Sequence, residues 1–226
     1  MNIYKALCTT DLVRVGAYPQ VYTYTIKDHK RPYDNVWNLR DEQSKNLEIS
    51  GSLSVDSKIT QLLSCVELCP GKGLLLENSV IALISKYLPN SCMLHPFTVA
   101  DDLHDKKYSY SFLEVGTTVE MLECVNYQKS SFYRNQFGEF HSEIDISSRA
   151  DWDLKQKTEI EQRSSLRILP KSLVLNTDIF ETCGVVQLPF DARIFFTEAV
   201  AKILLDNNIS GLCLVKEEGF LLSIAR

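Results

Sequence analysis

Short apolar runs alternate with polar stretches along the whole chain, and most of the runs have the period of a strand. Residues 20–26, QVYTYTI, alternate in a way that predicts a half-buried strand. The runs NIYKALC (residues 2–8) and NLEISGSL (residues 46–53) predict two more strands. Residues 57–69 fit a helix and a strand equally well. The first half of the chain is therefore predicted to be rich in strands.

Two segments combine a helical apolar stripe with signals for a helix start. In the first, Asn78 or Ser79 is a suitable N-cap, and Pro89 helps to end the helix near Leu88. In the second, Thr197 is the expected N-cap of a helix over residues 198–207. Each helix follows an apolar strand. Gly211 is expected to permit a sharp turn into the last strand.

The remaining segments complete the expected pattern. Residues 108–127 predict a hairpin that turns at Gly116 and Thr117, and residues 167–176 and 184–189 predict further strands. The polar residues 28–44, with Trp37 as an anchor, are expected to form a loop, and the charged residues 138–163 are expected to include an exposed loop. Mixed strands and short helices predict the α+β class, with mixed, mostly antiparallel sheets.

An internal repeat is a second expectation. A shift of 120 residues, without a gap, places Val66 on Val186, Leu68 on Leu188, Val80 on Val200 and Leu94 on Leu214. The same frame places Leu76 on Phe196, Leu83 on Ile203 and Ile84 on Leu204. The chain is therefore interpreted as one domain, 1–226, which could divide into sub-lobes 1–105 and 106–226. Two repeated β-α-β halves and chance convergence on one pattern both remain open.

Composition narrows the class of protein. The 226 residues are 45% hydrophobic with a net charge of −5, which is ordinary for a globular domain and argues against a nucleic-acid-binding surface. Seven cysteines, mostly within apolar runs, indicate buried thiols in a reducing compartment. No signal peptide and no apolar run of ~18 residues is found. A cytoplasmic protein that does not bind membranes is expected.

A search for chemistry predicts no catalytic, cofactor-binding or metal-binding residue, and the chain is not expected to be an enzyme. The four histidines have no HExxH or other metal-ligand spacing, and PGKG at residues 70–73 is too short for a P-loop. A nucleophilic pair remains an alternative, with His95 or His141 as the base and Cys92 or Cys124 as the thiol. Both cysteines lie in apolar segments, where burial suppresses the thiolate.

Acidic and aromatic residues between positions 139 and 153 predict a surface for contact with a partner. The polar neighbours of these carboxylates predict a wet setting, unlike that of a catalytic pair. Aromatic side chains are enriched at the centres of protein interfaces. A second acidic group lies at residues 100–105. The candidate contact residues are Glu139, Phe140, Glu143, Asp145, Asp151, Trp152, Asp153, Asp101 and Asp102.

A family resemblance is carried by two segments, YSYSFLEVGTTVEMLECVNYQKSSF (108–132) and VQLPFDARIFFTEAVAKILLDNNISGLCLV (186–215). Together they resemble the type-eleven immunity proteins of bacterial polymorphic toxin systems. The matching motifs are VNYQKS (125–130), IFFTE (194–198) and NISGLCL (208–214), and LLLENSVIALISKYL (74–88) is similar to the family's first helix. The resemblance covers residues 60–226. Asn126 stands where Asp is more usual, and the double CxxCG motif of some relatives is missing.

The resemblance implies a non-enzymatic protein that binds a cognate secreted toxin and blocks it. An acidic inhibitor would suit a basic toxin such as a nuclease, because opposite charges steer association. Two alternatives stay open: a scaffold or ligand-binding module with another partner, and a hydrolase that uses a Cys/His or a carboxylate pair.

Overall fold

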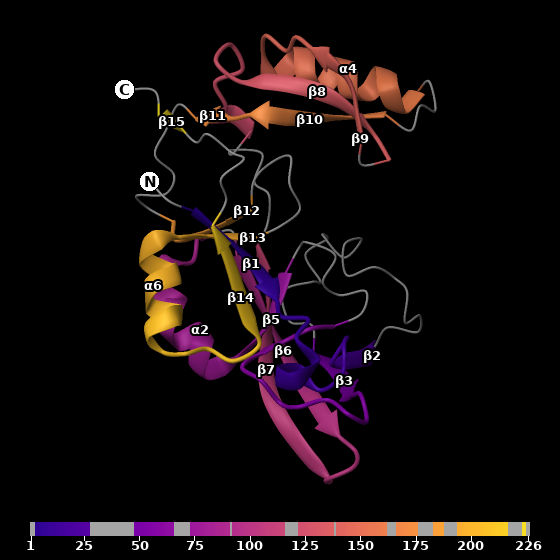
Figure 1. Cartoon of the computed structure of the whole chain (residues 1–226), viewed down its shortest axis with the longest axis vertical. Coiled ribbons are helices and arrows are strands. Elements are labelled where there is room, and N and C mark those ends of the chain that lie inside the picture. The colour runs from indigo at the N-terminus through magenta and orange to yellow at the C-terminus, as the bar shows by residue number, and fades with distance from the viewer. Residues whose placement is uncertain are drawn as a thin grey trace.

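A six-stranded sheet is the largest element of the computed structural model (Figure 1). The structure describes residues 3–27, 48–65, 73–90, 92–115, 122–137, 139–161, 166–175, 183–187, 194–216 and 223–224. In spatial order the strands are β2 (Val21–Ile26), β3 (Ile49–Leu53), β6 (Cys92–Asp101), β7 (Lys106–Val115), β5 (Gly73–Glu77) and β4 (Leu62–Leu63). Neighbouring strands are antiparallel except β3 and β6, which are parallel.

The two edges of this sheet are brought together. Val21 of β2 forms an isolated parallel bridge with Cys65, just after β4, and the Val21 N–H donates to the Ser64 carbonyl at 2.9 Å. The sheet therefore curls around an apolar interior, here called the curl core, which includes the fully buried Phe97 and Phe112.

A four-stranded sheet packs near it and is made from both ends of the chain. Its order is β12 (Val185–Gln187), β13 (Ile194–Thr197), β1 (Ile3–Cys8) and β14 (Leu212–Lys216). Helices α2 (Asn78–Ile84), followed by the short 3-10 helix η3 (Ser85–Tyr87), and α6 (Glu198–Asp206) contact each other, as Figure 1 shows. Val80 and Val200 come from the two helices into one central core, which both sheets share. A short helix, α1 (Leu12–Val15), follows β1.

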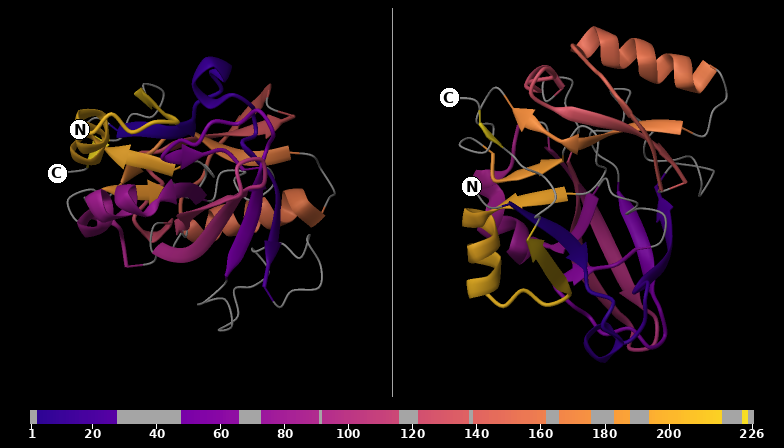
Figure 2. Two further views of the ribbon diagram at one scale, coloured as in Figure 1. Left: turned by 90° about the horizontal axis from the view of Figure 1, so that it is seen from below. Right: turned by 45° about the horizontal axis from the view of Figure 1, so that its top comes forward.

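The third part of the fold contains the charged segment. The strands β10 (Leu166–Ser172), β8 (Ser131–Gln136) and β9 (Glu139–Ile144) form an antiparallel sheet, with α4 (Arg149–Glu161) beside it. Figure 2 shows α4 lying across this sheet, away from α2 and α6. A parallel pair, β11 (Val174–Leu175) and β15 (Ser223–Ile224), completes the strands. Most of residues 139–161 is thus strand and helix, and the exposed loop expected within the charged segment is limited to residues 145–148, between β9 and α4.

The expected α+β class is confirmed by these mixed, mainly antiparallel sheets and short helices. The predicted helix over residues 198–207 is α6, and Thr197 has extended N-cap geometry but makes no side-chain capping bond. The boundary between the sub-lobes at residue 105 falls in the turn of the β6–β7 hairpin. No helix in the described ranges is long and apolar enough to cross a bilayer.

One predicted hairpin is wrong. Strand β7 is paired on both sides, with β6 and with β5, and both partners precede it in the chain. Gly116 and Thr117 lie outside the described residues, as do Trp37 and the polar stretch around it, and Leu122 and Glu123 are helical. The turn of the hairpin that does form is stabilised by Asp101, whose carboxylate accepts hydrogen bonds from the backbone and the ring of His104.

The strand registers show a structural repeat of two units. The first consists of β4, β5, α2, β6 and β7, and the second of β12, β13, α6, β14 and β1. In the first unit Leu76 of β5 pairs with Ser111 of β7, and Leu94 of β6 pairs with Leu113. In the second unit Phe196 of β13 pairs with Tyr4 of β1, and Leu214 of β14 pairs with Ala6. The 120-residue shift places Leu76 of β5 on Phe196 of β13, and Leu94 of β6 on Leu214 of β14. Their partners, Ser111 and Leu113 of β7, then match Tyr4 and Ala6 of β1. Strand β1 then stands where β7 stands in the first unit, so the repeat is circularly permuted.

The unbroken frame fails in one strand. In the first unit Leu62 pairs with Leu76, and in the second Val185 pairs with Phe196. Val185 therefore corresponds to Leu62, and Val186 corresponds to Leu63. The predicted match of Val186 with Val66 is wrong, because the link from β4 to β5 is longer than the link from β12 to β13. Val66, Leu68 and Leu188 lie outside the described residues. The helix matches agree with the structure: Val80, Val200, Ile84 and Leu204 are all buried.

Candidate functional site

The predicted acidic surface divides between two distant places. Residues of β9 and α4 lie at the top of Figure 1, whereas Asp101 and Asp102 lie in the turn between β6 and β7 at the bottom. Asp102 is exposed, but Asp101 is buried. Burial opposes ionisation of Asp101, yet the hydrogen bonds from His104 outweigh it and lower the pKa of the carboxyl. Asp101 is therefore a turn-forming residue.

Most carboxylates of the upper group are already neutralised within the chain. Glu143 on β9 pairs with Lys171 at 2.8 Å, and Asp153 on α4 pairs with Arg149 at 2.7 Å. Asp151 accepts hydrogen bonds from the backbone of Ser147 at 2.9 Å and from Lys155 at 3.0 Å. Such exposed pairs add little stability but reduce the field that a partner would meet. Asp151 lies in the first turn of α4, where a negative charge stabilises the helix, and this is its local role.

Two aromatic positions differ in their role. Trp152 is only partly exposed and packs against the core between α4 and β8, with the Arg149 guanidinium 5.4 Å from its ring. Phe140 on β9 is 60% exposed, and its ring stacks on Tyr133 at 5.8 Å. Phe137, in the turn before β9, is 86% exposed at a φ of +51°. The sequence singled out Trp152 but not Phe137.

The charge arrangement at Asp151 predicts a pH-dependent stability. The backbone hydrogen bond from Ser147 and the contact with Lys155 lower the pKa of Asp151 in the folded chain. Stabilisation by this carboxylate is therefore present above its ordinary pKa and is lost as the pH falls through the lower, folded value. We expect Asp151→Asn to lower the urea midpoint at about pH 7, and to differ less from wild type at about pH 3.

Leu154→Ala is the matched control, because it changes an exposed residue of the same helix that does not titrate. Its effect should be the same at both pH values. A difference between Asp151→Asn and wild type that stays undiminished in acid would contradict the assigned role of Asp151.

The alternative Cys/His pair gains no support from the geometry. Cys92 and His95 lie three residues apart on β6, so their side chains point to opposite faces of the sheet. Burial raises the pKa of the Cys92 thiol to about 12, with smaller contributions from Cys183 and Glu114. His141 is exposed, and its ring nitrogen contacts the neighbouring Ser142 hydroxyl at 3.2 Å. Cys124 is partly exposed in a short helical turn.

A buried polar pair was not foreseen from the sequence. His95 is 1% exposed, and its Nε2 lies 3.1 Å from Oε2 of Glu114 on β7. Within the described ranges Nδ1 of His95 has no hydrogen-bond partner. The pair lies beside Phe112, on the face of the sheet that encloses the curl core. The described residues hold no group of three or more metal-ligating side chains, there or elsewhere.

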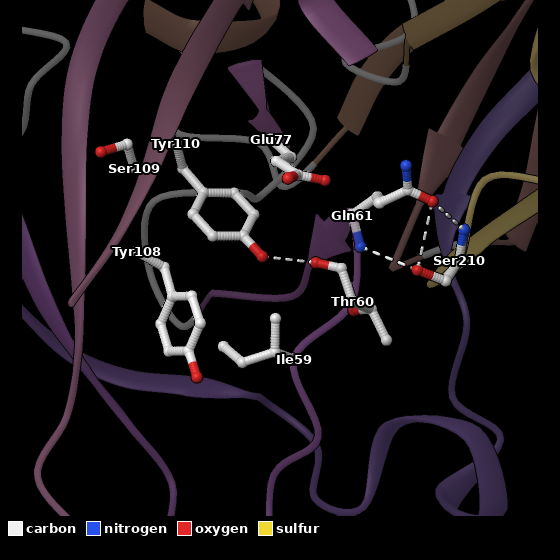
Figure 3. A pocket seen from close by; sticks show the side chains of 8 residues that line it. All are labelled: Ile59, Thr60, Gln61, Glu77, Tyr108, Ser109, Tyr110 and Ser210. Carbon is white, nitrogen blue, oxygen red and sulfur yellow. Dashed lines mark hydrogen bonds between the residues drawn. The ribbon is translucent and has the colours of Figure 1, made fainter. Parts of the chain in front are cut away.

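Figure 3 shows a small pocket of about 140 Å³ where residues 59–61 meet the loop before β14. The Tyr110 hydroxyl donates to the Thr60 carbonyl at 2.6 Å, and burial raises the pKa of this tyrosine. Gln61 and Ser210 hydrogen-bond each other through backbone and side chain. These groups are engaged in holding the two loops together, so the pocket is a structural joint.

The motifs that carry the family resemblance also form joints. The Asn126 side chain accepts a hydrogen bond from the Lys129 N–H at 3.1 Å, while its own N–H donates to the Val174 carbonyl at 2.8 Å. The Ser130 hydroxyl donates to the Asn126 carbonyl at 2.7 Å and accepts from the Val174 N–H at 3.0 Å. Asp could accept the same bond at position 126, so Asn preserves the turn.

The other motif segments have equally local roles. Ile194–Thr197 is β13, and Glu198 begins α6. Residues 208–211 form the loop that leads into β14, where Asn208 and Gly211 both have positive φ. The expected turn at Gly211 is thus confirmed. No protein-family model matches the chain, and no curated protein has a matching sequence, so its family membership stays a prediction from the residues.

Proposed function

We propose that this chain is an immunity protein that binds a cognate secreted toxin and neutralises it by direct contact. The observation that carries the proposal is the resemblance of residues 60–226 to type-eleven immunity proteins. The resembling motifs coincide with structural joints: the Asn126 turn, the junction of β13 with α6, and the loop before β14. A resemblance at such positions concerns the fold, and the function follows by analogy.

Fewer residues are available for contact with a partner than the sequence predicts. Glu143, Asp151 and Asp153 are paired, and Trp152 packs inward. In the described ranges no ion pair involves the exposed Glu139 or Asp145, which lie at either end of β9. Together with the exposed Phe137 and Phe140, in and just before the same strand, these residues are here called the β9 surface. Exposed aromatic residues with unpaired charges are typical of protein interfaces.

The direct experiment is co-expression in a susceptible host. The toxin candidate is the C-terminal domain of a secreted protein encoded beside this chain, expressed with and without it. Under the proposal this chain restores growth, and the two proteins co-purify. Killing that continues in its presence, with no co-purification, would reject the proposal for that pair.

Charge reversal tests the β9 surface. We expect the double variant Glu139→Lys and Asp145→Lys to weaken association with the toxin domain about tenfold at low salt, and less at high salt, because exposed charges are screened. The measurement is binding kinetics at several salt concentrations. Asp102→Lys, at the opposite end of the molecule, is the matched control and should bind like wild type. Unchanged affinity and salt dependence in the double variant would remove the β9 surface from the interface.

A second candidate function is a non-catalytic binding module for another partner. It is favoured by a pocket of about 470 Å³ next to α6 and β14, whose lining combines leucines with polar residues such as Arg14 and Asn208. A volume of this size is within the range of ligand sites. Rescue from a toxin separates the two functions, because a binding module would not provide it.

A further inference from the structure

The small pocket of Figure 3 contains a negative charge that the chain does not neutralise. Gln61 and Ser210, which hold the two loops together, form one side of it, and Tyr108 and Tyr110 lie on the other. Glu77, the last residue of β5, also lines the pocket. Its side chain is partly exposed and makes no capping bond to α2, and no ion pair in the described part of the chain includes it. The pocket therefore offers an unpaired carboxylate together with two aromatic rings.

The structural repeat shows that the fold does not need this carboxylate. Under the 120-residue shift Glu77 corresponds to Thr197. Each of the two is the N-cap of the helix that follows, and neither makes a capping bond through its side chain. Across the sheet Glu77 is paired with Tyr110, whereas Thr197 is paired with Ile3, and both members of the second pair are buried. The same junction of strand and helix therefore forms without a charge.

The volume and the groups of the pocket suit a basic side chain. The pocket measures about 140 Å³, below the roughly 300–1,000 Å³ of sites for whole small molecules, so it fits the end of one side chain. A carboxylate pairs with an ammonium or guanidinium group, and tyrosine rings attract the same cations. The charge of Glu77 already acts on Tyr110, because it adds to the effect of burial in raising the pKa of that hydroxyl. A cation in the pocket would meet both groups.

A neighbouring pocket favours a polypeptide as the source of the cation. The pocket of about 470 Å³ beside α6 shares Thr60 and Ser210 with the small pocket, so the two adjoin each other. Its lining includes Leu205, which is 60% exposed on the last turn of α6, and the pocket is here called the Leu205 pocket. An extended chain presents alternate side chains on one face and can therefore fill two adjoining pockets. A free amine would fill only the small one.

We propose that the small pocket binds, through Glu77, a basic side chain of a partner protein, with an aliphatic residue of the same segment in the Leu205 pocket. The net charge of −5 favours the approach of such a basic segment. The two pockets and the β9 surface are built from different elements, so this is a separate place of contact. It applies to a toxin or to any other protein partner and does not rest on the proposed function.

The experiment uses the full chain and three short peptides with blocked ends. The arginine peptide is Leu-Gly-Arg-Gly-Leu, the glutamine peptide Leu-Gly-Gln-Gly-Leu lacks the charge, and the serine peptide Ser-Gly-Arg-Gly-Ser lacks the leucines. Binding is followed by NMR titration, with the backbone amides of Thr60, Gln61 and Ser210 as reporters. We expect the arginine peptide to shift these amides, but not those of β9, and to bind about tenfold more tightly than the glutamine peptide. The serine peptide should bind about threefold more weakly than the arginine peptide, and Leu205→Ser should abolish that difference.

Two substitutions at one position test the charge. Glu77→Gln keeps the size of the side chain and removes the charge, and Glu77→Thr copies the second unit. Both should weaken binding of the arginine peptide about tenfold and reduce its salt dependence, while the urea midpoint stays close to that of wild type. Glu139→Gln removes an exposed carboxylate of β9 and changes the net charge equally. It is the matched control and should bind like wild type.

A glutamine peptide that binds as well as the arginine peptide would overturn the proposal, and so would wild-type binding by both Glu77 variants. Equal binding of the arginine and serine peptides would assign the small pocket to a free cation instead of a protein segment. Loss of binding together with a large fall of the urea midpoint in both variants would give Glu77 a role in the fold and not in recognition. None of these results bears on rescue from a toxin, which tests the proposed function separately.

Discussion

Replacing Gly211 by alanine is expected to lower the free energy of unfolding by about 3–5 kcal/mol. Gly211 has a φ of +81°, which an L residue adopts only with strain. A Cβ atom there would lie 2.1 Å from the Leu62 carbonyl oxygen and 2.6 Å from the Thr60 hydroxyl. Neither group can move freely, because the Leu62 oxygen already accepts a hydrogen bond from Thr60 at 2.7 Å. Backbone strain and overlap therefore add.

Urea unfolding followed by circular dichroism measures this loss. Ser210→Ala is the matched control in the same loop, since it removes only exposed hydrogen bonds to Gln61 and should cost about 1 kcal/mol or less. If the two variants are equally stable, the close approach of Gly211 to residues 60–62 is not a structural requirement.

Gln20→Leu is expected to have the second large effect, about 3–5 kcal/mol of lost stability. Gln20 is 1% exposed, and its side-chain nitrogen donates to the Lys58 carbonyl at 2.7 Å and to the Thr60 hydroxyl at 2.9 Å. Its side-chain oxygen accepts from the Ser64 N–H at 3.1 Å. Leucine fills a similar volume but leaves these buried groups unsatisfied. The network joins β2 to the segment before β4, so the curl of the sheet depends on it.

Gln61→Leu is the control for Gln20→Leu, because it makes the same chemical change at a partly exposed glutamine, which hydrogen-bonds Ser210 (Figure 3). Its expected cost is about 1 kcal/mol or less. Comparable losses from the two variants, measured by urea unfolding, would show that burial of the Gln20 network is not what stabilises the edge closure.

The helices were the most predictable elements. Val200 and Leu204 of α6 form an apolar stripe, and the preceding Thr197 marks the start, so local signals were sufficient. Helix α4 has no such stripe. It depends on the caps at Ser147 and Ser148 and on an ion pair between Glu159 and Arg134 of β8, which becomes visible only when the strands are placed. The charged, weakly amphipathic sequence therefore did not predict a helix.

The candidate contact surface was predictable only in part. Exposure of Glu139 and Phe140 followed from their polar surroundings. The pairing of Glu143 with Lys171 did not, because it joins residues far apart in the chain. Phe137 was missed because a single aromatic residue between polar neighbours has no pattern. The place of β14 at the end of the described sheet order was also not predictable, because LCLV has the pattern of a buried strand.

The circular permutation has a consequence for synthesis on the ribosome. Strand β1 is translated before all other described strands, yet Lys5 of β1 lies opposite Phe195 of β13 and Val215 of β14 in the sheet. The curled sheet can fold as soon as residues up to 115 have emerged, while β1 must wait with its backbone unpaired until nearly the whole chain is made. Non-local pairing of this kind slows folding and exposes a nascent chain to aggregation. Because β1 pairs with β13 and β14, the second unit can form only after both of these strands have been synthesised.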